Sequence, residues 1–329
     1  MVIPTLAADA RLLECLRSLE RQTRRDFEVV VVDNSGRGLV RRLAGSDGWK
    51  TIENERNAGF GAAVNQGFRI SQAPFLATLN DDAVAHPSWL EALAAAIAGR
   101  PDAGMCASQV RLFGRDVLDS AGLRVAADGS SKQRGHLRPP AEFASAEEVL
   151  APSGSAALYR REMLDQIGLF EEDYFLYCED TDLGLRAARA GWKCLYVPGA
   201  IVEHHYSHSA GAASQLKAYL VERNRLYTVA RNFPARLWPG ALAASLARYL
   251  WHAWYLIRGR GTTARYRQEG NSLWRMPWFV LRAHLALVAA LPRLLRARRR
   301  MARGARLSAP AFAALLAAHS ISVREVAEL

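Results

Sequence analysis

An acidic stretch, residues 179–182, places three carboxylates within four positions: Glu179, Asp180 and Asp182. It follows an aromatic run, residues 174–177, and precedes an apolar segment that is compatible with a helix. Crowded carboxylates repel one another and raise one another's pKa, as a general base or a metal site requires. The simpler interpretation is an acidic helix start, where unpaired N–H groups and the helix dipole favour negative side chains. That alternative explains one carboxylate better than three, so we favour a functional site.

Two apolar runs, residues 27–32 and Phe75–Leu79, predict strands that are buried on both faces of a parallel sheet. The first ends in Asp33 and the second in Asn80-Asp81-Asp82. Ligands of such sheets lie beyond the carboxyl ends of the strands, and adjacent carboxylates there suit a divalent cation that bridges phosphates. The alternative at both places is a turn rich in Asn and Asp, with Asp33 as its cap.

Two other stretches give weaker signals. Residues 54–68 contain glycines that suit close approach to a phosphate or tight helix packing, but they match neither the dinucleotide fingerprint nor the phosphate loop. Residues 204–208 contain three histidines, a pattern typical of metal binding. Surface histidines in a polar loop are the alternative.

The surrounding elements predict an α/β fold. Leucines at helical spacing predict a first helix over residues 9–22, so the chain opens as strand, helix, strand and turn. The first strand begins almost at Met1, so either it is short or a few native residues are missing. Polar residues 114–150 predict an irregular insertion. Further helices and strands are expected at residues 87–98, 103–112, 161–167 and 193–197.

The composition is that of a folded chain. Half of the 329 residues are hydrophobic, which excludes a disordered tail protein and suffices for one large or two modest domains. The four cysteines are far apart, which argues against a zinc site and a disulfide framework and fits a reducing compartment. The N-terminus shows no secretory signal pattern.

These motifs, taken in order, resemble the family 2 glycosyltransferases of the GT-A fold, close to the rhamnosyltransferase-like group of bacterial surface-polysaccharide synthesis. The resemblance covers about residues 1–235, and Asn80 replaces the first acid of the family's Asp-x-Asp motif. The matching landmarks are Pro4-Thr5, residues 31–35, Asn57-x-Gly59-Phe60-Gly61-x-x-x-Asn65-x-Gly67, Leu79-Asn80-Asp81-Asp82, Glu179-Asp180-x-Asp182-Leu183-x-x-Arg186, His204-x-x-Ser207-x-Ser209 and Arg223-Asn224.

The resemblance implies a Rossmann-like nucleotide-binding domain with a mostly parallel sheet, and inverting sugar transfer from a nucleotide-diphosphate sugar to a glycan or polyprenyl-linked acceptor. Asp180 would take the acceptor proton, with Glu179 and Asp182 orienting the acceptor or the base. Asp82 and His204 would hold Mg²⁺ or Mn²⁺ on the diphosphate. The expected donor-binding residues are Pro4, Thr5, Asp33, Asn57, Asn65, Asn80 and Asp81.

Residues 236–329 form a basic C-terminal region. Between residues 236 and 306 there are 15 arginines, no lysine and one acid, a net charge of +14, so the remainder of this +11 chain carries −3. Residues 237–257 are marginal as a membrane span because of Arg248, and residues 276–292 are too short. Apolar residues of the second stretch recur at helical spacing beside tryptophans and arginines, which predicts amphipathic helices.

These features predict a peripheral enzyme on the inner face of a bacterial cytoplasmic membrane, with an anionic membrane surface as a partner. A helical domain with a solvated basic rim is the alternative. Nucleic acid is not expected as a partner, because aromatic RNA-binding signatures are absent from the sequence. Two other functions remain open: a catalytically inactive sugar-nucleotide-binding scaffold, and a sugar nucleotidyltransferase, which would leave the Glu179-Asp180 motif unexplained.

Overall fold

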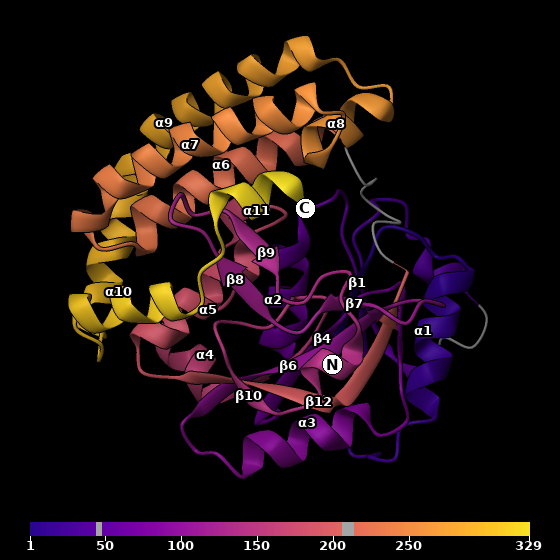
Figure 1. The fold of residues 1–329 in the computed structure, drawn as a ribbon. Helices are drawn as coiled ribbons and strands as arrows, with labels where there is room; N and C mark the ends of the chain where they lie inside the picture. The colour runs from indigo at the N-terminus through magenta and orange to yellow at the C-terminus, as the bar shows by residue number, and fades with distance from the viewer. Residues whose placement is uncertain (44–47, 206–213) are drawn as a thin grey trace. The chain divides into compact units, whose positions relative to one another are not determined.

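The computed structural model describes residues 1–43, 48–205 and 214–329. It divides into two compact units (Figure 1), each of which is described by itself. The first unit comprises Met1–Leu123 and Gln133–Ser209. The second comprises Arg124–Lys132 and Ala210–Leu329.

A mixed, mostly parallel sheet forms the centre of the first unit. Strands β1, β2, β3 and β4 are parallel neighbours, β11 is antiparallel between β4 and β6, and β12 runs parallel to β6. The strands in spatial order are β10 (Glu147–Val149), β12 (Lys193–His204), β6 (Ala103–Leu112), β11 (Ala156–Arg160), β4 (Phe75–Leu79), β1 (Val2–Thr5), β2 (Val30–Asp33) and β3 (Lys50–Glu53). The short strands β5 (Ala83–Ala85) and β7 (Leu118–Ser120) pair with β12 and β6.

Helices cover both faces of this sheet, because its central strands are apolar on both sides. One buried cluster joins the sheet to α2, α4 and α5, and a second joins the opposite face to α1 and α3. The helices are α1 (Ala10–Glu20), α2 (Phe60–Ile70), α3 (Trp89–Ala98), α4 (Arg161–Ile167) and α5 (Glu179–Arg189). The predicted α/β class is therefore confirmed.

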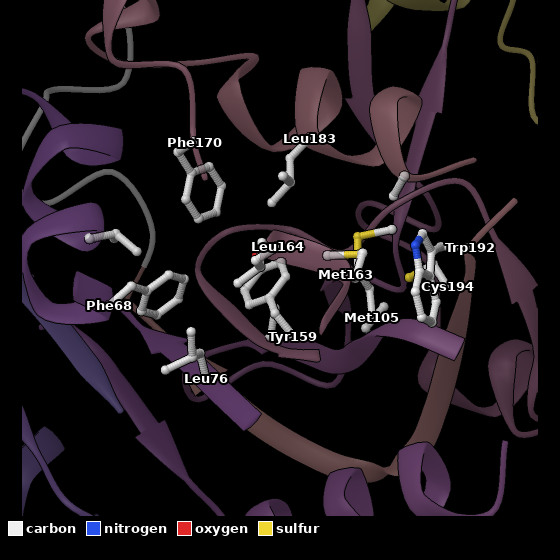
Figure 2. Close-up of a cluster of buried hydrophobic side chains, with 14 of the residues drawn as sticks. Phe68, Leu76, Met105, Tyr159, Met163, Leu164, Phe170, Leu183, Trp192 and Cys194 are labelled. Atoms are coloured by element: carbon white, nitrogen blue, oxygen red, sulfur yellow. The ribbon is translucent and has the colours of Figure 1, made fainter. Parts of the chain in front are cut away.

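The first cluster contains a group of aromatic side chains that fixes α2 and the segment before α5 on the sheet. Figure 2 shows Phe68, Tyr159 and Phe170 in this cluster, with Phe170 beside Leu183 of α5. The ring of Tyr159 lies edge-on to Phe170 at a centroid distance of 5.7 Å, and Phe68 lies 6.1 Å from Tyr159. Such pairs add to the stability that burial itself gives.

Residues 114–150 differ from the expected irregular insertion. They contain β7, β10 and a separate pair of short strands, β8 (Leu123–Val125) and β9 (Ser131–Gln133). Each of these strands has three residues, so no alternation of apolar and polar residues is long enough to be recognised in the sequence.

The second unit consists mainly of helices. Helix α6 packs along α9, and α7 contacts α8 and α11. The helices are α6 (Gln215–Asn232), α7 (Trp238–Ile257), α8 (Gly261–Gln268), α9 (Met276–Arg303), α10 (Ala309–Ala318) and α11 (Val323–Glu328).

Helix α6 therefore groups with the C-terminal helices, whereas the sequence places a boundary after residue 235. The physical reason is a buried ion network inside this unit. Arg248 of α7 donates to Asp128 and to Glu222 of α6, at 2.6 Å each, and Glu222 also pairs with Arg225. All four side chains are buried, so removing any one of them would leave a buried network with an uncompensated net charge.

Helix α9 is longer than the sequence suggests. Residues 276–292 are too short to span a bilayer, but the helix continues through Pro292 to Arg303. Among the described helices, the stretch Leu273–Arg303 is the one that is long and apolar enough to cross a membrane by length and composition alone. Only 22% of its apolar window is buried in the structure, which distinguishes it from an ordinary core helix.

Candidate active site

The carboxyl ends of β1, β2 and β4 bring several predicted site residues to one edge of the sheet. Thr5 ends β1, Asp33 ends β2, and Asn80-Asp81-Asp82 follows β4. The Thr5 hydroxyl donates to an Asp81 carboxylate oxygen at 2.6 Å. Burial raises the pKa of Asp81 to about 6 against the opposing effect of this bond, and the charge of Asp82 contributes to the rise. Pro4 lies one residue before Thr5 on β1, half-buried, opposite Val32.

Asp33 accepts hydrogen bonds from the loop that follows it. One carboxylate oxygen accepts from the backbone N–H and the hydroxyl of Ser35, and the other accepts from the Val40 N–H at 2.9 Å. Burial alone would raise the pKa of Asp33, but these bonds outweigh it and lower the pKa. The turn-capping alternative therefore describes the observed contacts of Asp33.

Asp82 and His204 are in direct contact. Nε2 of His204 lies 3.1 Å from an Asp82 carboxylate oxygen and 3.2 Å from the side-chain nitrogen of Asn80. Nδ1 of His204 lies 2.8 Å from an oxygen of Asp119 on β7. Burial alone would lower the pKa of His204, but the two carboxylates together raise it to about 10.

The pair has the chemistry of two ligands of one divalent cation. Mg²⁺ binds its ligands at about 2.0–2.1 Å in octahedral geometry, so two neighbouring ligand atoms lie about 3 Å apart. The 3.1 Å between the Asp82 oxygen and the His204 nitrogen is the distance of their ion pair, and two atoms this close could also bind one cation. Within residues 1–43, 48–205 and 214–329, no group of three or more His, Cys, Asp and Glu residues is arranged to hold a metal. Asp82 and His204 would thus supply at most two protein ligands to a divalent cation.

Helix α5 begins at Glu179, directly after a strained turn. Phe175, Tyr177 and Cys178 all have positive φ, at 62°, 71° and 67°. Non-glycine residues in this region cost about 1–3 kcal/mol each and concentrate at functional sites. The turn is held by the N–H of Phe60, which donates to the Phe175 carbonyl at 2.7 Å.

Asp180 projects from the first turn of α5 onto the segment before β11. One carboxylate oxygen accepts from the Gly154 N–H at 3.2 Å, and the other accepts from the Thr181 N–H at 2.7 Å. Burial raises the pKa of Asp180 despite these bonds. The carbonyl of the next residue along, Ser155, accepts from the Asn80 N–H at 2.8 Å. Residues 153–155 thus connect the Asp180 carboxylate to the end of β4.

Glu179 is buried beside Asp180, and its Oε2 makes no hydrogen bond to any residue that the structure describes. Burial and the neighbouring charge of Asp180 raise the pKa of Glu179 to about 8. Because burial also raises the pKa of Asp180, the pair disfavours two negative charges at once.

Asp182, in contrast, makes contacts that hold the fold together. It is fully buried and accepts from Nε of Arg186 at 2.8 Å, one helical turn later. Arg186 also donates to the carbonyls of residues 167–169. The acidic cluster thus separates into two groups, because the carboxylates of Asp180 and Asp182 bond to different segments.

The predicted asparagines also have structural contacts. The Asn65 amide donates to the Phe170 carbonyl at 2.8 Å and accepts from its N–H at 3.0 Å. The exposed Asn57 accepts from the Gly59 N–H and from Asn34. Asn65 thereby holds the segment at Phe170, and Asn57 holds the loop that follows β2. Ser207, Ser209 and His208 lie outside the described residues.

Two residues that contact the predicted site residues are themselves absent from the predicted set. Gly154 donates to Asp180, and Asp119 contacts His204. Gly154 belongs to a Ser-Gly-Ser turn, which is a recognisable signal. Asp119 lies in the stretch predicted to be irregular, and nothing in the sequence distinguishes it from other loop acids.

Comparisons with known proteins identify the family of the chain. A sequence profile described as "Glycosyl transferase family 2" matches residues 1–168. The chain is 32% identical over 251 residues to the N-acetylglucosaminyl-diphospho-decaprenol L-rhamnosyltransferase of Mycobacterium tuberculosis (strain CDC 1551 / Oshkosh), covering 67% of this chain and 80% of that protein. It is 39% identical over 67 residues to the rhamnosyltransferase WbbL of Escherichia coli (strain K12), and this match covers 20% of this chain and 25% of that protein.

The fold has a counterpart among solved structures. The crystal structure of GalNAc-T7 with UDP, GalNAc and Mn²⁺ matches with a TM-score of 0.57 at 18% identity. The match covers 70% of this chain and 47% of that chain, so it shows a shared fold.

Proposed function

Because the chain belongs to glycosyl transferase family 2, we propose that it transfers a sugar from a nucleotide-diphosphate sugar to an acceptor hydroxyl with inversion at the anomeric carbon. The chain is a glycosyltransferase of the rhamnosyltransferase-like group. The name of the mycobacterial relative supports L-rhamnose as the sugar and a lipid-linked acceptor, an N-acetylglucosaminyl-diphospho-polyprenol.

The observation that supports this proposal best is the connection through residues 153–155. Gly154 donates to Asp180, and Ser155 accepts from Asn80 at the end of β4. A base and a diphosphate-binding strand end are thereby held by adjacent backbone groups. Holding two reacting groups in a fixed geometry lowers the barrier by avoiding the loss of their relative freedom during reaction.

Asp180 is the general base of the proposed reaction. Its raised pKa makes its carboxylate a stronger base than an exposed aspartate. The acceptor O–H bond breaks as the oxygen bonds to the anomeric carbon, Asp180 takes the proton, and the nucleoside diphosphate leaves with the electron pair of the broken glycosidic bond. Burial raises the pKa of both Glu179 and Asp180, so a state with two negative charges is disfavoured beside the acceptor.

Asp82 and His204 hold the divalent cation, Mg²⁺ or Mn²⁺, in this proposal. When bound, the cation neutralises charge on the departing diphosphate. Thr5, Asn80 and Asp81 contact the donor at the strand ends, next to Pro4. Asp33, Asn57 and Asn65 act indirectly by fixing the loops around it, as their contacts suggest.

We also propose that the second unit attaches the enzyme to the inner face of the cytoplasmic membrane. The support is the combination of α9, which has apolar exposed side chains, with 15 arginines between residues 236 and 306. Membrane attachment concentrates the enzyme where a polyprenyl-linked acceptor resides.

Asp180→Asn tests the reaction. Nucleoside diphosphate release should fall by a factor of about 10²–10⁴, the usual contribution of a positioned base, while donor binding, followed by a thermal-shift assay, stays near wild type. Asp165→Asn, an exposed acid on α4, is the matched control and should change neither. Near-wild-type turnover in Asp180→Asn would remove Asp180 from this role. Pyrophosphate as the product would indicate a nucleotidyltransferase, and binding without turnover in wild type would indicate a scaffold.

A further inference from the structure

His204 is held from both sides by buried carboxylates. Nε2 faces Asp82 at 3.1 Å and Nδ1 faces Asp119 at 2.8 Å. All three side chains are buried, and they come from three separate segments: the end of β4, β7 and the end of β12. Of the two carboxylates, only Asp82 belongs to the family motif, so the contribution of Asp119 needs its own explanation.

Asp119 occupies an irregularity of the sheet that directs its side chain. In the β6–β7 pair, Val110 lies opposite Ser120, and the next residue, Arg111, lies opposite Leu118. Asp119 is thus the extra residue of a β-bulge. Bulges change the direction of a side chain and are frequent beside active sites. On the other side of β6, His204 lies in register with Leu112.

An imidazole ligand presents a lone pair to a cation only in the correct tautomer. A partner that accepts the hydrogen of the remote nitrogen fixes both the tautomer and the orientation of the ring. We propose that Asp119 is the positioning residue for His204, accepting Nδ1–H so that Nε2 stays directed at the Asp82 carboxylate where the cation binds. This inference rests on the proposed metal-assisted transfer, and it adds a residue that acts through His204.

Purely structural pairing is the competing explanation, since Asp119 also lies 3.4 Å from Nδ1 of His136. The two explanations differ in what a neutral replacement does. A structural role affects the free energy of unfolding. A positioning role also weakens cation binding in protein that is fully folded. The amide introduced by Asp119→Asn can turn its nitrogen toward Nδ1, and that orientation favours the tautomer with hydrogen on Nε2.

The test measures Mn²⁺ affinity of the full-length protein by electron paramagnetic resonance of free Mn²⁺, in the presence of saturating UDP, GDP or dTDP. Asp119→Asn should raise the Kd for Mn²⁺ by about 10–100-fold, the usual effect of losing the partner of a metal-bound histidine. Asp119→Glu, which keeps a carboxylate, should recover most of the affinity. Glu14→Gln is the matched control, because Glu14 pairs with the neighbouring His205 at 3.2 Å and should leave the Kd unchanged.

The outcomes distinguish a failure of the proposed metal site from a failure of the role given to Asp119. If wild-type protein binds no Mn²⁺ with any of the nucleotides, both the metal site of the proposed function and this inference are wrong. If wild type binds and folded Asp119→Asn binds equally well, Asp119 has only a structural role and the proposed function stands. If Asp119→Asn does not fold, Asp119→Ser replaces it, and an unchanged Kd in that variant would equally overturn the inference.

Discussion

Asp180 and Asp182 lie two positions apart on α5, yet their surroundings differ in kind. Asp180 accepts from backbone N–H groups of Gly154 and Thr181, and burial raises its pKa. Asp182 is fully buried and paired with the guanidinium of Arg186. A base must exchange protons with a substrate, whereas a buried carboxylate in an ion pair keeps its charge. The geometry thus supports Asp180 as the reactive group and Asp182 as its support.

Asp182→Asn should therefore lower the free energy of unfolding more than it lowers the turnover of the folded enzyme. Removing one partner of a buried ion pair costs about 3–5 kcal/mol in the free energy of unfolding, measured here by urea denaturation. Asp165→Asn at an exposed position should change this free energy by about 0.5 kcal/mol or less. A stable Asp182→Asn variant with a large loss of turnover would instead make Asp182 a catalytic residue.

The sequence identifies the acidic positions but cannot assign their roles. Glu179, Asp180 and Asp182 are all carboxylates in one short stretch, so the sequence does not distinguish them. Their roles depend on which segment each side chain contacts. Arg186 could be foreseen as a partner of Asp182 from the four-residue spacing on a helix. The Gly154 N–H that meets Asp180 lies 26 positions away in the sequence, and only the fold brings it there.

At the scale of elements, the start of α2 positions the strained turn before α5. Gly59 precedes α2 with φ at 89°, a conformation that side chains rarely adopt. A Cβ atom at this position would collide with the Phe175 carbonyl oxygen and ring. The contact between the α2 start and the turn thus requires glycine for two independent reasons.

Gly59→Ala should consequently destabilise the first unit by about 1–3 kcal/mol from backbone strain, with more from the collision. Turnover should fall as well, because the turn before Glu179 must move. Gly240→Ala is the matched control: nothing lies within 4 Å of a Cβ there, and the residue is inside helix α7. That change should stabilise by about 0.5–1 kcal/mol. Equal melting temperatures for both variants would contradict the role given to Gly59.

Some elements could be predicted closely, and the reasons are local. Strand β4 and helix α4 have the expected bounds, since a continuous apolar run and a helical repeat are local signals. The antiparallel direction of β11 cannot be predicted, because the sequence of one strand does not indicate which strands it pairs with. Helix α9 passes Pro292, which normally ends or kinks a helix, so the sequence pattern gives a shorter helix than the structure has.

At the scale of the whole molecule, buried titratable groups set the dependence of stability on pH. The pKa values of Asp119 and Glu222 are lowered to about 2, because histidine and arginine partners overcome the opposing effect of burial. Their stabilisation is complete above their unfolded pKa values, near 4, and is lost as pH falls toward 2. The pKa of His204 is raised to about 10, so its stabilisation is complete below about 6.5 and is lost as pH rises through 10.

The melting temperature, measured in the presence of a chelator, should therefore be highest between about pH 4.5 and 6.5. Raised pKa values of Asp81 and Glu179, about 6 and 8, act in the same direction, since burying these carboxylates in charged form costs more as pH rises. A maximum near pH 9 would show that these charge assignments are wrong.

The surface of the second unit bears on the proposed membrane attachment. Exposed apolar side chains recur every three or four residues along Leu273–Arg303, so they share one face of the helix. They are Trp274, Trp278, Leu281, Leu285 and Val288. The opposite face, with Ala283, Ala290 and Leu294, is buried. Arg282 is exposed near the middle of this apolar stretch, and a central arginine costs about 2.5–3.5 kcal/mol in a spanning helix. These facts favour a helix that lies in the interface.

Full-length protein should float with anionic liposomes, less with neutral ones, and less again at high salt, because each arginine near an anionic surface contributes about 1 kcal/mol. Replacing Trp274, Trp278 and Leu285 together by Gln removes apolar insertion without altering charge, and flotation should fall by at least about tenfold. Ile70→Gln, at an apolar residue on α2 about as exposed as Trp278 and Leu285, should float like wild type. Flotation of the triple variant at the wild-type level would show that α9 is not the attachment surface. Resistance of wild type to both salt and alkaline carbonate would show that the helix spans the bilayer rather than lying on it.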